Sequence, residues 1–350
     1  MSGGPPVGFA GRIVRWQRAH GRNTLPWQDT HDPYRVWLSE IMLQQTQVAT
    51  VLDYYARFLE RFPGVRQLAA AEPDEVMALW SGLGYYSRAR NLHRCAQDVV
   101  ALHAGQFPRT AQALQTLPGI GRSTAAAIAS FCFGERVAIL DGNVKRVLTR
   151  VLGYGADLAQ AAHERQLWDH AQAMLPRRTL AESMPRYTQG LMDLAATVCT
   201  ARNPACLACP VSNLCVARRE GEPEAYPVKT RKLKRSAQAL WLLRAHNRDG
   251  LTWLERRPAS GIWAGLFCLP VFESRDALRA AVPVKAHPRL EDGEPFRHVL
   301  THKDLHLHPV VVQMASERPP ANSEGAWYAD AELHRLGLPA PIRRLLGAPR

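Results

Sequence analysis

Apolar residues recur at every third or fourth position through most of the first two thirds of this chain, which is the spacing that places them on one face of a helix. One such stripe spans 48–58 and another spans 144–152. Pro-Gly pairs, such as Pro63-Gly64 and Pro118-Gly119, interrupt the pattern and indicate turns. We therefore predict that the chain is helical from Pro33 to about Cys215.

The pattern changes after residue 220, where a segment with glycine and proline leads into the basic stretch 229–235. Beyond it, apolar runs over 239–245, 251–255 and 305–312 are typical of strands. Helical spacing returns near 276–281 and 330–336. The sequence pattern after the basic stretch therefore predicts an α/β domain.

A chain of 350 residues is long enough for two domains, each with its own core. We predict a helical domain over 1–220, a linker over 221–236 and a smaller α/β domain over 237–350. The fold class is therefore a mainly α N-terminal region followed by an α/β C-terminal domain.

The charge balance points to a polyanionic partner. Lys and Arg total 44 against 31 Asp and Glu, a net charge of +13. Such an excess is typical of nucleic-acid binding, although a charge spread over a solvated surface would give the same sum. No apolar run is long enough to cross a membrane, and the start of the chain has no secretory signal pattern, so we expect a cytoplasmic protein.

Four of the seven cysteines gather in one short stretch with gaps of six, two and five residues: Cys199, Cys206, Cys209 and Cys215. Disulfides would require an oxidising compartment, so thiolate metal ligation is the better interpretation. Zinc sites usually pair two C-x2-C units, whereas only one such pair occurs here. The spacing therefore favours an iron-sulfur cluster, with zinc as the alternative.

A glycine hairpin precedes one predicted helix. Gly119 and Gly121 lie two residues apart, directly before the helical run 125–130. Glycines allow a tight turn, and backbone N–H groups at a helix N-terminus bind phosphate. The pattern is also that of a plain helix-to-helix turn.

Two carboxylates suit glycosidic-bond cleavage. Asp141 stands directly before the predicted helix over 144–152, where it can cap the helix and keep a negative charge that stabilises a developing cation. Glu40 has apolar neighbours on both sides, and burial would leave it protonated and able to donate a proton. A general acid and an ionised carboxylate form the pair that such cleavage uses. The alternative is that Glu40 lies on the solvent-exposed face of its helix and has no catalytic role.

These motifs, together with 25–27, 37–48, 82–91 and 140–147, resemble the helix-hairpin-helix DNA glycosylases with an iron-sulfur cluster, and within them the adenine-excising family. The resemblance implies two helical lobes, an iron-sulfur loop carrying a [4Fe-4S] cluster, and excision of adenine mispaired with 8-oxoguanine or guanine in duplex DNA. The adenine would be flipped into a pocket. Glu40 would protonate it, and Asp141 would stabilise the oxocarbenium-like sugar.

The resemblance also assigns residues around the base. Asn143 would support Asp141, and we interpret Lys145 as a phosphate contact like the hairpin glycines. The remaining residues of the adenine pocket and the opened helix would be Arg22, Leu25, Trp27, Gln189, Leu43, Gln45 and Tyr85.

The rival within the superfamily is the endonuclease III type, which excises oxidised pyrimidines and cuts the strand through a lysine Schiff base. Here Ser123 stands at that lysine's position, so no amine is available to attack the sugar. A non-catalytic DNA-binding protein is a third possibility, but the presence of both Glu40 and Asp141 argues against it.

The C-terminal segments 253–258 and 261–270 resemble a Nudix-related domain that recognises 8-oxoguanine. The glutamate-rich helix that would hold magnesium is missing after Pro270, so the domain should bind without hydrolysing. The resemblance places Thr301 in the loop that faces the damaged base. We expect a monomer, since one chain holds both recognition modules, with replication or repair proteins as possible partners.

Overall fold

The computed structural model describes residues 6–230, 235–314 and 325–347. The chain forms two compact units, one built from 1–69 with 94–232 and the other from 70–93 with 233–350. Residues 231–234 of the predicted linker lie outside the described residues. None of the helices in these three ranges combines the length and apolarity needed to cross a membrane.

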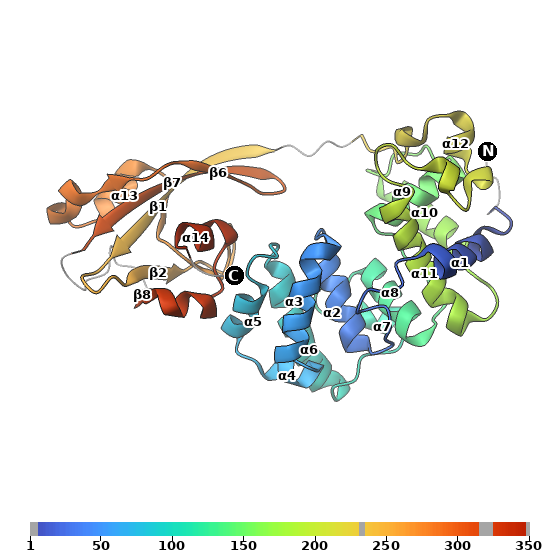
Figure 1. Ribbon diagram of the computed structural model, residues 1–350, viewed down its shortest axis with the longest axis horizontal. Coiled ribbons are helices and arrows are strands. Elements are labelled where there is room, and N and C mark those ends of the chain that lie inside the picture. Colours follow the sequence, from blue (N-terminus) through green and yellow to red (C-terminus); the bar gives the residue numbers. More distant parts are fainter. Residues whose placement is uncertain (1–5, 231–234, 315–324, 348–350) are drawn as a thin grey trace. The chain divides into compact units, whose positions relative to one another are not determined.

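The first unit is helical, as predicted (Figure 1). α6 (Ser87–His103) begins in the second unit and ends in the first. The other helices of this unit are α1 (Phe9–His20), α2 (Pro33–Leu43), α3 (Val48–Arg61), α4 (Val65–Ala70), α7 (Ala111–Leu114), α8 (Arg122–Phe133), α9 (Gly142–Leu152), α10 (Ala161–Ala173), α11 (Leu180–Thr197) and α12 (Val216–Glu220).

Local signals fix the helix ends that matter for the site. Asp32 caps α2 by accepting the N–H of Tyr34 at 3.0 Å, and Pro33 occupies the first helical position. α9 ends at Gly153, whose φ of 62° is the left-handed conformation that glycine adopts without strain. These ends place Glu40 near the last turn of α2 and Asp141 directly before α9.

The pairing of α1 with α11 was not predicted, because the helical pattern was recognised only from Pro33 onward. Phe9 and Ile13 of α1 are buried in the core, and the ring of Phe9 lies edge-on to that of Tyr187, with centroids 6.2 Å apart. Gly190 permits this close packing, since a Cβ there would lie 2.7 Å from Cγ2 of Ile13. α1 therefore belongs to the helical core.

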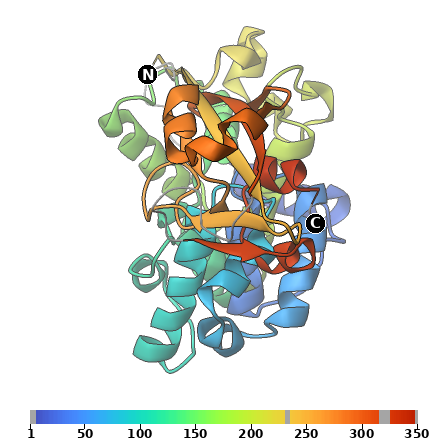
Figure 2. The same cartoon turned by 90° about the vertical axis from the view of Figure 1, so that its left-hand side faces the viewer.

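The second unit contains a mixed sheet. Its strands are β1 (Ser236–His246), β2 (Thr252–Arg256), β3 (Phe267–Cys268), β4 (Val271–Phe272), β5 (Glu291–Asp292), β6 (Phe296–Val299), β7 (Lys303–Gln313) and β8 (Gly325–Tyr328). The order is β3-β2-β1-β7-β5, with β4 on β1, β6 on β7 and β8 on β2. β1 and β7 run parallel and side by side in both views (Figures 1 and 2).

The prediction of an α/β C-terminal domain is thus confirmed. The three strand predictions correspond to β1, β2 and β7, and the helix near 276–281 corresponds to α13 (Arg275–Ala281). Leu278 of α13 is fully buried in the core that the sheet forms. The segment near 330–336 is a 3-10 helix, η5 (Asp330–Arg335), and not an α-helix.

The second unit also includes residues 70–93, which lie well before the predicted linker in the sequence. α5 (Pro73–Trp80) lies in this unit, and Nη1 of Arg256 donates to Oδ1 of Asp74 at 2.8 Å. The hydroxyl of Ser81 donates to the carbonyl oxygen of Leu338 at 2.6 Å. The 82–91 motif therefore belongs to the second unit, together with the C-terminal part of the chain.

Candidate functional site

Glu40 has the protonation state expected of a general acid. The surrounding protein desolvates its carboxyl, and the nearby charge of Asp141 adds to this effect, so that the pKa of Glu40 rises to about 8. By surface area the residue is half-buried. Glu40 can therefore donate a proton at neutral pH.

Asp141 is the N-cap of α9, as one interpretation of the sequence expected. Its Oδ1 accepts the N–H of Val144 at 2.7 Å. The hydroxyl of Ser123, on the first turn of α8, accepts the N–H of Leu140 at 3.1 Å. A side chain of α8 thus holds the main chain directly before Asp141, and the first turn of α9 holds the carboxylate of Asp141.

Arg146 connects the start of α9 with the first cysteine. Its Nη1 donates to Oδ1 of Asn143 at 3.2 Å, and its Nε donates to the carbonyl oxygen of Cys199 at 2.8 Å. Its Nη2 donates to the carbonyl oxygen of Ala195, also at 2.8 Å. Asn143 therefore contacts Arg146 in this structure, and its support of Asp141 stays a prediction.

Arg22 and Gln189, two of the predicted base-pocket residues, meet at a carboxylate that the sequence did not single out. Asp193 is fully buried on α11. Its Oδ1 accepts Nε of Arg22 at 2.8 Å and Nε2 of Gln189 at 2.9 Å, and its Oδ2 accepts the main-chain N–H of Arg22 at 3.1 Å. Gly21 leaves room for this approach, since a Cβ there would lie 3.0 Å from Oδ2.

The other two predicted pocket residues, Trp27 and Leu25, have partners other than Asp193. Trp27 is only 7% exposed and packs edge-on against Tyr55, with ring centroids 5.3 Å apart. Leu25 is half-buried in a turn, and its N–H donates to Oε1 of Gln28 at 3.3 Å. Trp27 is therefore a core residue in this structure, and its role at a base stays a prediction.

The glycine hairpin joins α7 to α8. Gly119 has a φ of 76°, and Gly121 is the N-cap of α8 with no side-chain cap. The space beside Gly121 is open, so the first N–H groups of α8 have the geometry that binds anions. Lys145, the predicted phosphate contact, forms an ion pair with Glu164 at 2.6 Å. DNA would have to compete with Glu164 for its ammonium group.

Backbone conformation marks two residues that the resemblance placed at the opened helix. Gln45, two residues after Leu43 ends α2, has a φ of 56° and is exposed, and Tyr85 has a φ of 47°. Left-handed non-glycine residues are strained and often functional. Within the second unit, the hydroxyls of Tyr85 and Thr301 form a hydrogen bond of 2.7 Å.

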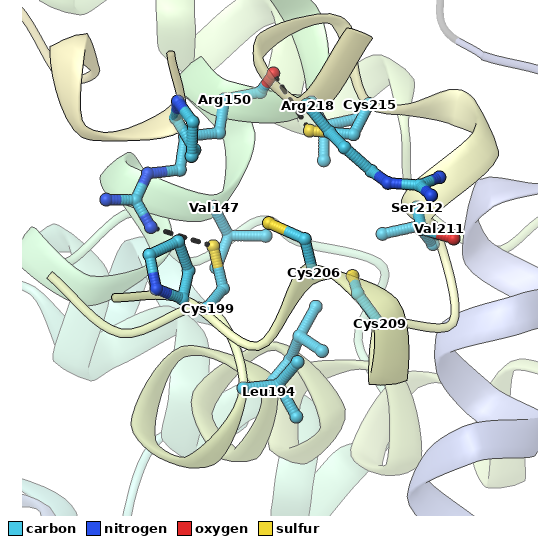
Figure 3. A pocket seen from close by; sticks show the side chains of 14 residues that line it. Val147, Arg150, Leu194, Cys199, Cys206, Cys209, Val211, Ser212, Cys215 and Arg218 are labelled. Atoms are coloured by element: carbon cyan, nitrogen blue, oxygen red, sulfur yellow. Dashed lines mark hydrogen bonds between the residues drawn. The ribbon is translucent and has the colours of Figure 1, made fainter. Parts of the chain in front are cut away.

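The four clustered cysteines line one cavity in the first unit (Figure 3). Cys199 follows α11, Cys206 begins the 3-10 turn η1 (Cys206–Ala208), Cys209 ends that turn, and Cys215 follows the turn η2 (Ser212–Leu214). Their sulfurs surround the cavity, whose other walls include Val147, Leu194 and Val211.

This donor set fits a thiolate-bound cluster. None of these four cysteines forms a disulfide, and all four are partly accessible. Thiolates suit both iron-sulfur clusters and zinc, and the sulfurs lie around a common space in Figure 3. Within the described residues, no three His, Cys, Asp or Glu side chains converge closely enough to hold a single ion, so the four sulfurs surround a larger space.

The sequence analysis missed three charged residues: Asp193, Arg146 and Arg150. Local spacing gave no clear signal for Asp193 and Arg150, because polar Gln189 and Arg146 lie one helical turn before them on the same faces. Arg150 is 2% exposed. The identity of each partner depends on segments distant in sequence.

Family models match three parts of the chain. The HhH-GPD superfamily of base excision DNA repair proteins matches residues 38–173, a NUDIX domain matches 240–348, and the iron-sulfur binding domain of endonuclease III matches 199–215. The last match contains all four clustered cysteines. The segment 199–215 is therefore an iron-sulfur binding segment.

Among similar proteins, the adenine DNA glycosylase of Buchnera aphidicola subsp. Acyrthosiphon pisum (strain APS) is 34% identical, covering 97% of this chain and 96% of its own length. The adenine DNA glycosylase of Homo sapiens is 45% identical over 62% of this chain and 40% of its own.

Two solved structures share the fold of the helical region. A thermostable thymine-DNA glycosylase has 28% identity and a TM-score of 0.53, covering 61% of this chain and 95% of its own. A non-covalent endonuclease III–DNA complex has 20% identity and a TM-score of 0.50, covering 61% and 94%, and indicates a common fold alone. Given its similarity over nearly full length to an adenine DNA glycosylase and the three family matches, this chain is a DNA glycosylase that belongs to the adenine DNA glycosylase family.

Proposed function

We propose that this enzyme hydrolyses the N-glycosidic bond of adenine mispaired with 8-oxoguanine, or with guanine, in duplex DNA. The observation that carries the proposal is the raised pKa of Glu40 beside Asp141. An acid that keeps its proton at neutral pH, next to a second carboxylate, is what departure of a neutral adenine requires. Adenine is a poor leaving group until one of its ring nitrogens is protonated.

In this mechanism Glu40 donates its proton to the flipped adenine, and the C–N bond breaks as positive charge develops on the sugar. Asp141 stabilises that charge from the start of α9. Water then adds to the sugar carbon and passes its proton to the carboxylate of Glu40, which restores the acid and leaves an abasic site. The hydrogen bonds from Val144 to Asp141 and from Leu140 to Ser123 support a fixed position for the carboxylate during these steps.

The base-binding part of the proposal assigns Arg22 and Gln189 to the adenine. Both are oriented by Asp193, and the Arg22 side chain is 31% exposed, so it has access to a ligand. The C-terminal domain would contribute recognition of 8-oxoguanine, with Tyr85 and Thr301 as the candidate contacts. Gly119, Gly121 and, after release from Glu164, Lys145 would hold phosphates.

We further propose that the cluster is of the [4Fe-4S] type, held by Cys199, Cys206, Cys209 and Cys215. The arrangement of the sulfurs around one cavity supports a cofactor larger than a single ion. When bound, the cluster gives the loop its shape, and no step of the hydrolysis passes through it. About four irons and four sulfides per chain are expected, with absorbance near 400 nm; one zinc per chain would overturn this assignment.

The substrate assignment is tested with a duplex containing adenine opposite 8-oxoguanine. Free adenine and an alkali-labile abasic site are expected, without strand cleavage before alkali. Strand cleavage by the enzyme itself would favour the lyase alternative, which Ser123 argues against. Absence of released adenine from A:8-oxoguanine and A:guanine duplexes, in a protein that binds them, would overturn the proposal.

A further inference from the structure

Arg150 is a charged residue buried beside the cysteine cavity. It lies on α9 and is only 2% exposed. Its Nη1 donates to the carbonyl oxygen of Thr200 at 2.6 Å and to Sγ of Cys199 at 3.4 Å. Its Nη2 donates to the carbonyl oxygen of Ala201 at 3.1 Å, and its Nε donates to that of Tyr226 at 3.4 Å. Each guanidinium nitrogen therefore has an acceptor.

Arg150 also meets the other end of the cysteine loop. Its main-chain carbonyl oxygen lies 3.3 Å from Sγ of Cys215 (Figure 3). One residue of α9 thus contacts both the first and the last cysteine of the set. The contact with Cys215 belongs to the main chain, whereas the side chain of Arg150 acts at the Cys199 end of the loop.

The chemistry of the guanidinium gives this contact a second consequence. The guanidinium carries a positive charge, and a buried positive charge is costly without a compensating anion. The acceptors around Arg150 are three carbonyl oxygens and the sulfur of Cys199. Only the cysteine becomes anionic when it ligates iron. The ligated state therefore supplies the countercharge for Arg150.

We propose that Arg150 is a positioning residue for the iron-sulfur cluster, which retains the cluster by anchoring the start of the cysteine loop through Thr200 and Ala201 and raises its reduction potential through the charge and N–H donor directed at Cys199. Hydrogen bonds and positive charge at a cluster sulfur favour the more negative, reduced state. This inference rests on the cluster, and the identity of the excised base does not affect it.

The test compares R150M, which removes charge and donors, with R150K, which keeps the charge but loses the planar set of donors. The matched control is R136M, since Arg136 holds another loop of the same unit through Nε to the carbonyl oxygen of Pro176 at 2.8 Å. For each holoprotein, without DNA, one measures iron and sulfide content, the rate at which a chelator bleaches absorbance near 400 nm, and the reduction potential by voltammetry.

We expect R150M to lose its cluster at least about tenfold faster than the wild type, and its potential to fall by the equivalent of about tenfold in the one-electron equilibrium, ~59 mV. R150K should bleach faster than the wild type yet keep most of the potential. R136M should match the wild type in both. If R150M and R150K keep the wild-type bleaching rate and potential, or R136M bleaches as fast as R150M, the proposal fails. Failure to release adenine would instead overturn the proposed substrate and leave these measurements unchanged.

Discussion

The hydroxyl of Ser123 accepts a hydrogen bond from the main-chain N–H of Leu140 at 3.1 Å. Leu140 directly precedes Asp141, so a side chain at the start of α8 sets the backbone that presents this carboxylate. The residue at the position of the lyase lysine is therefore a structural neighbour of Asp141. Its contribution to hydrolysis should come from positioning.

Replacing Ser123 by Ala removes the acceptor for Leu140 N–H. We expect a loss of about 1 kcal/mol in transition-state stabilisation, or roughly fivefold in the single-turnover rate, with little change in DNA affinity. Ser123→Thr keeps a hydroxyl and serves as the control. A rate for Ser123→Ala equal to that of the wild type would show that this hydrogen bond does not position Asp141.

The pH dependence of hydrolysis should report the ionisation of Glu40. Desolvation, together with the charge of Asp141, raises its pKa to about 8, and the protonated form is the one that acts as an acid. The single-turnover rate should therefore be steady near pH 7 and fall as pH rises through about 8. Glu40→Gln should be inactive at every pH. A wild-type rate that stays constant up to pH 10 would exclude Glu40 as the proton donor.

The same shift predicts a pH-dependent stability. The native state binds the Glu40 proton more tightly than the unfolded chain, whose carboxyl has an ordinary pKa of about 4.5. This contribution is fully present below about pH 4.5 and is lost as pH rises through about 8. Glu40→Gln should therefore gain in Tm relative to the wild type between pH 5 and 9. Exposed Glu60, replaced by Gln, provides the control; an equal gain there would refute the assignment.

Asp193 should control base binding through Arg22 and Gln189. Asp193→Asn keeps the size of the side chain but removes the charge that Arg22 meets at 2.8 Å. A charged hydrogen bond contributes about 1.5–3 kcal/mol, so adenine release should slow by roughly tenfold or more. Exposed Asp169, changed to Asn, is the matched control. The idea is wrong if adenine release by Asp193→Asn equals that of the control while both proteins are folded.

The Tyr85–Thr301 hydrogen bond should help the enzyme to distinguish 8-oxoguanine from guanine as the base opposite adenine. We expect Tyr85→Phe and Thr301→Val each to reduce the preference for 8-oxoguanine over guanine by several-fold. The double variant should be little worse than either single one, because both changes remove one interaction of about 0.5–1.5 kcal/mol. The measurement is the ratio of single-turnover rates on the two duplexes. Fully additive losses would mean that the two hydroxyls act separately.

Much of the fold follows from periodicity. The stripes over 48–58 and 144–152 became α3 and α9, and three predicted strands became β1, β2 and β7. The pattern did not identify α1, whose membership in the core depends on a close approach at Gly190. Nor does the periodicity indicate that 70–93 groups with the C-terminal unit. Both features depend on contacts between distant segments, which local spacing does not encode.

Amino-acid type and spacing alone determined which groups could carry chemistry: two carboxylates, and four thiols with the gaps of a cluster site. The family resemblance added a serine where a lysine would allow strand cleavage. The tertiary structure decided how those groups behave. Packing raised the pKa of Glu40, and folding brought Asp193 to Arg22 and Gln189. It also buried Arg150 against Cys199. Desolvation and hydrogen bonding act through space, so they are fixed only when segments far apart in the chain come together.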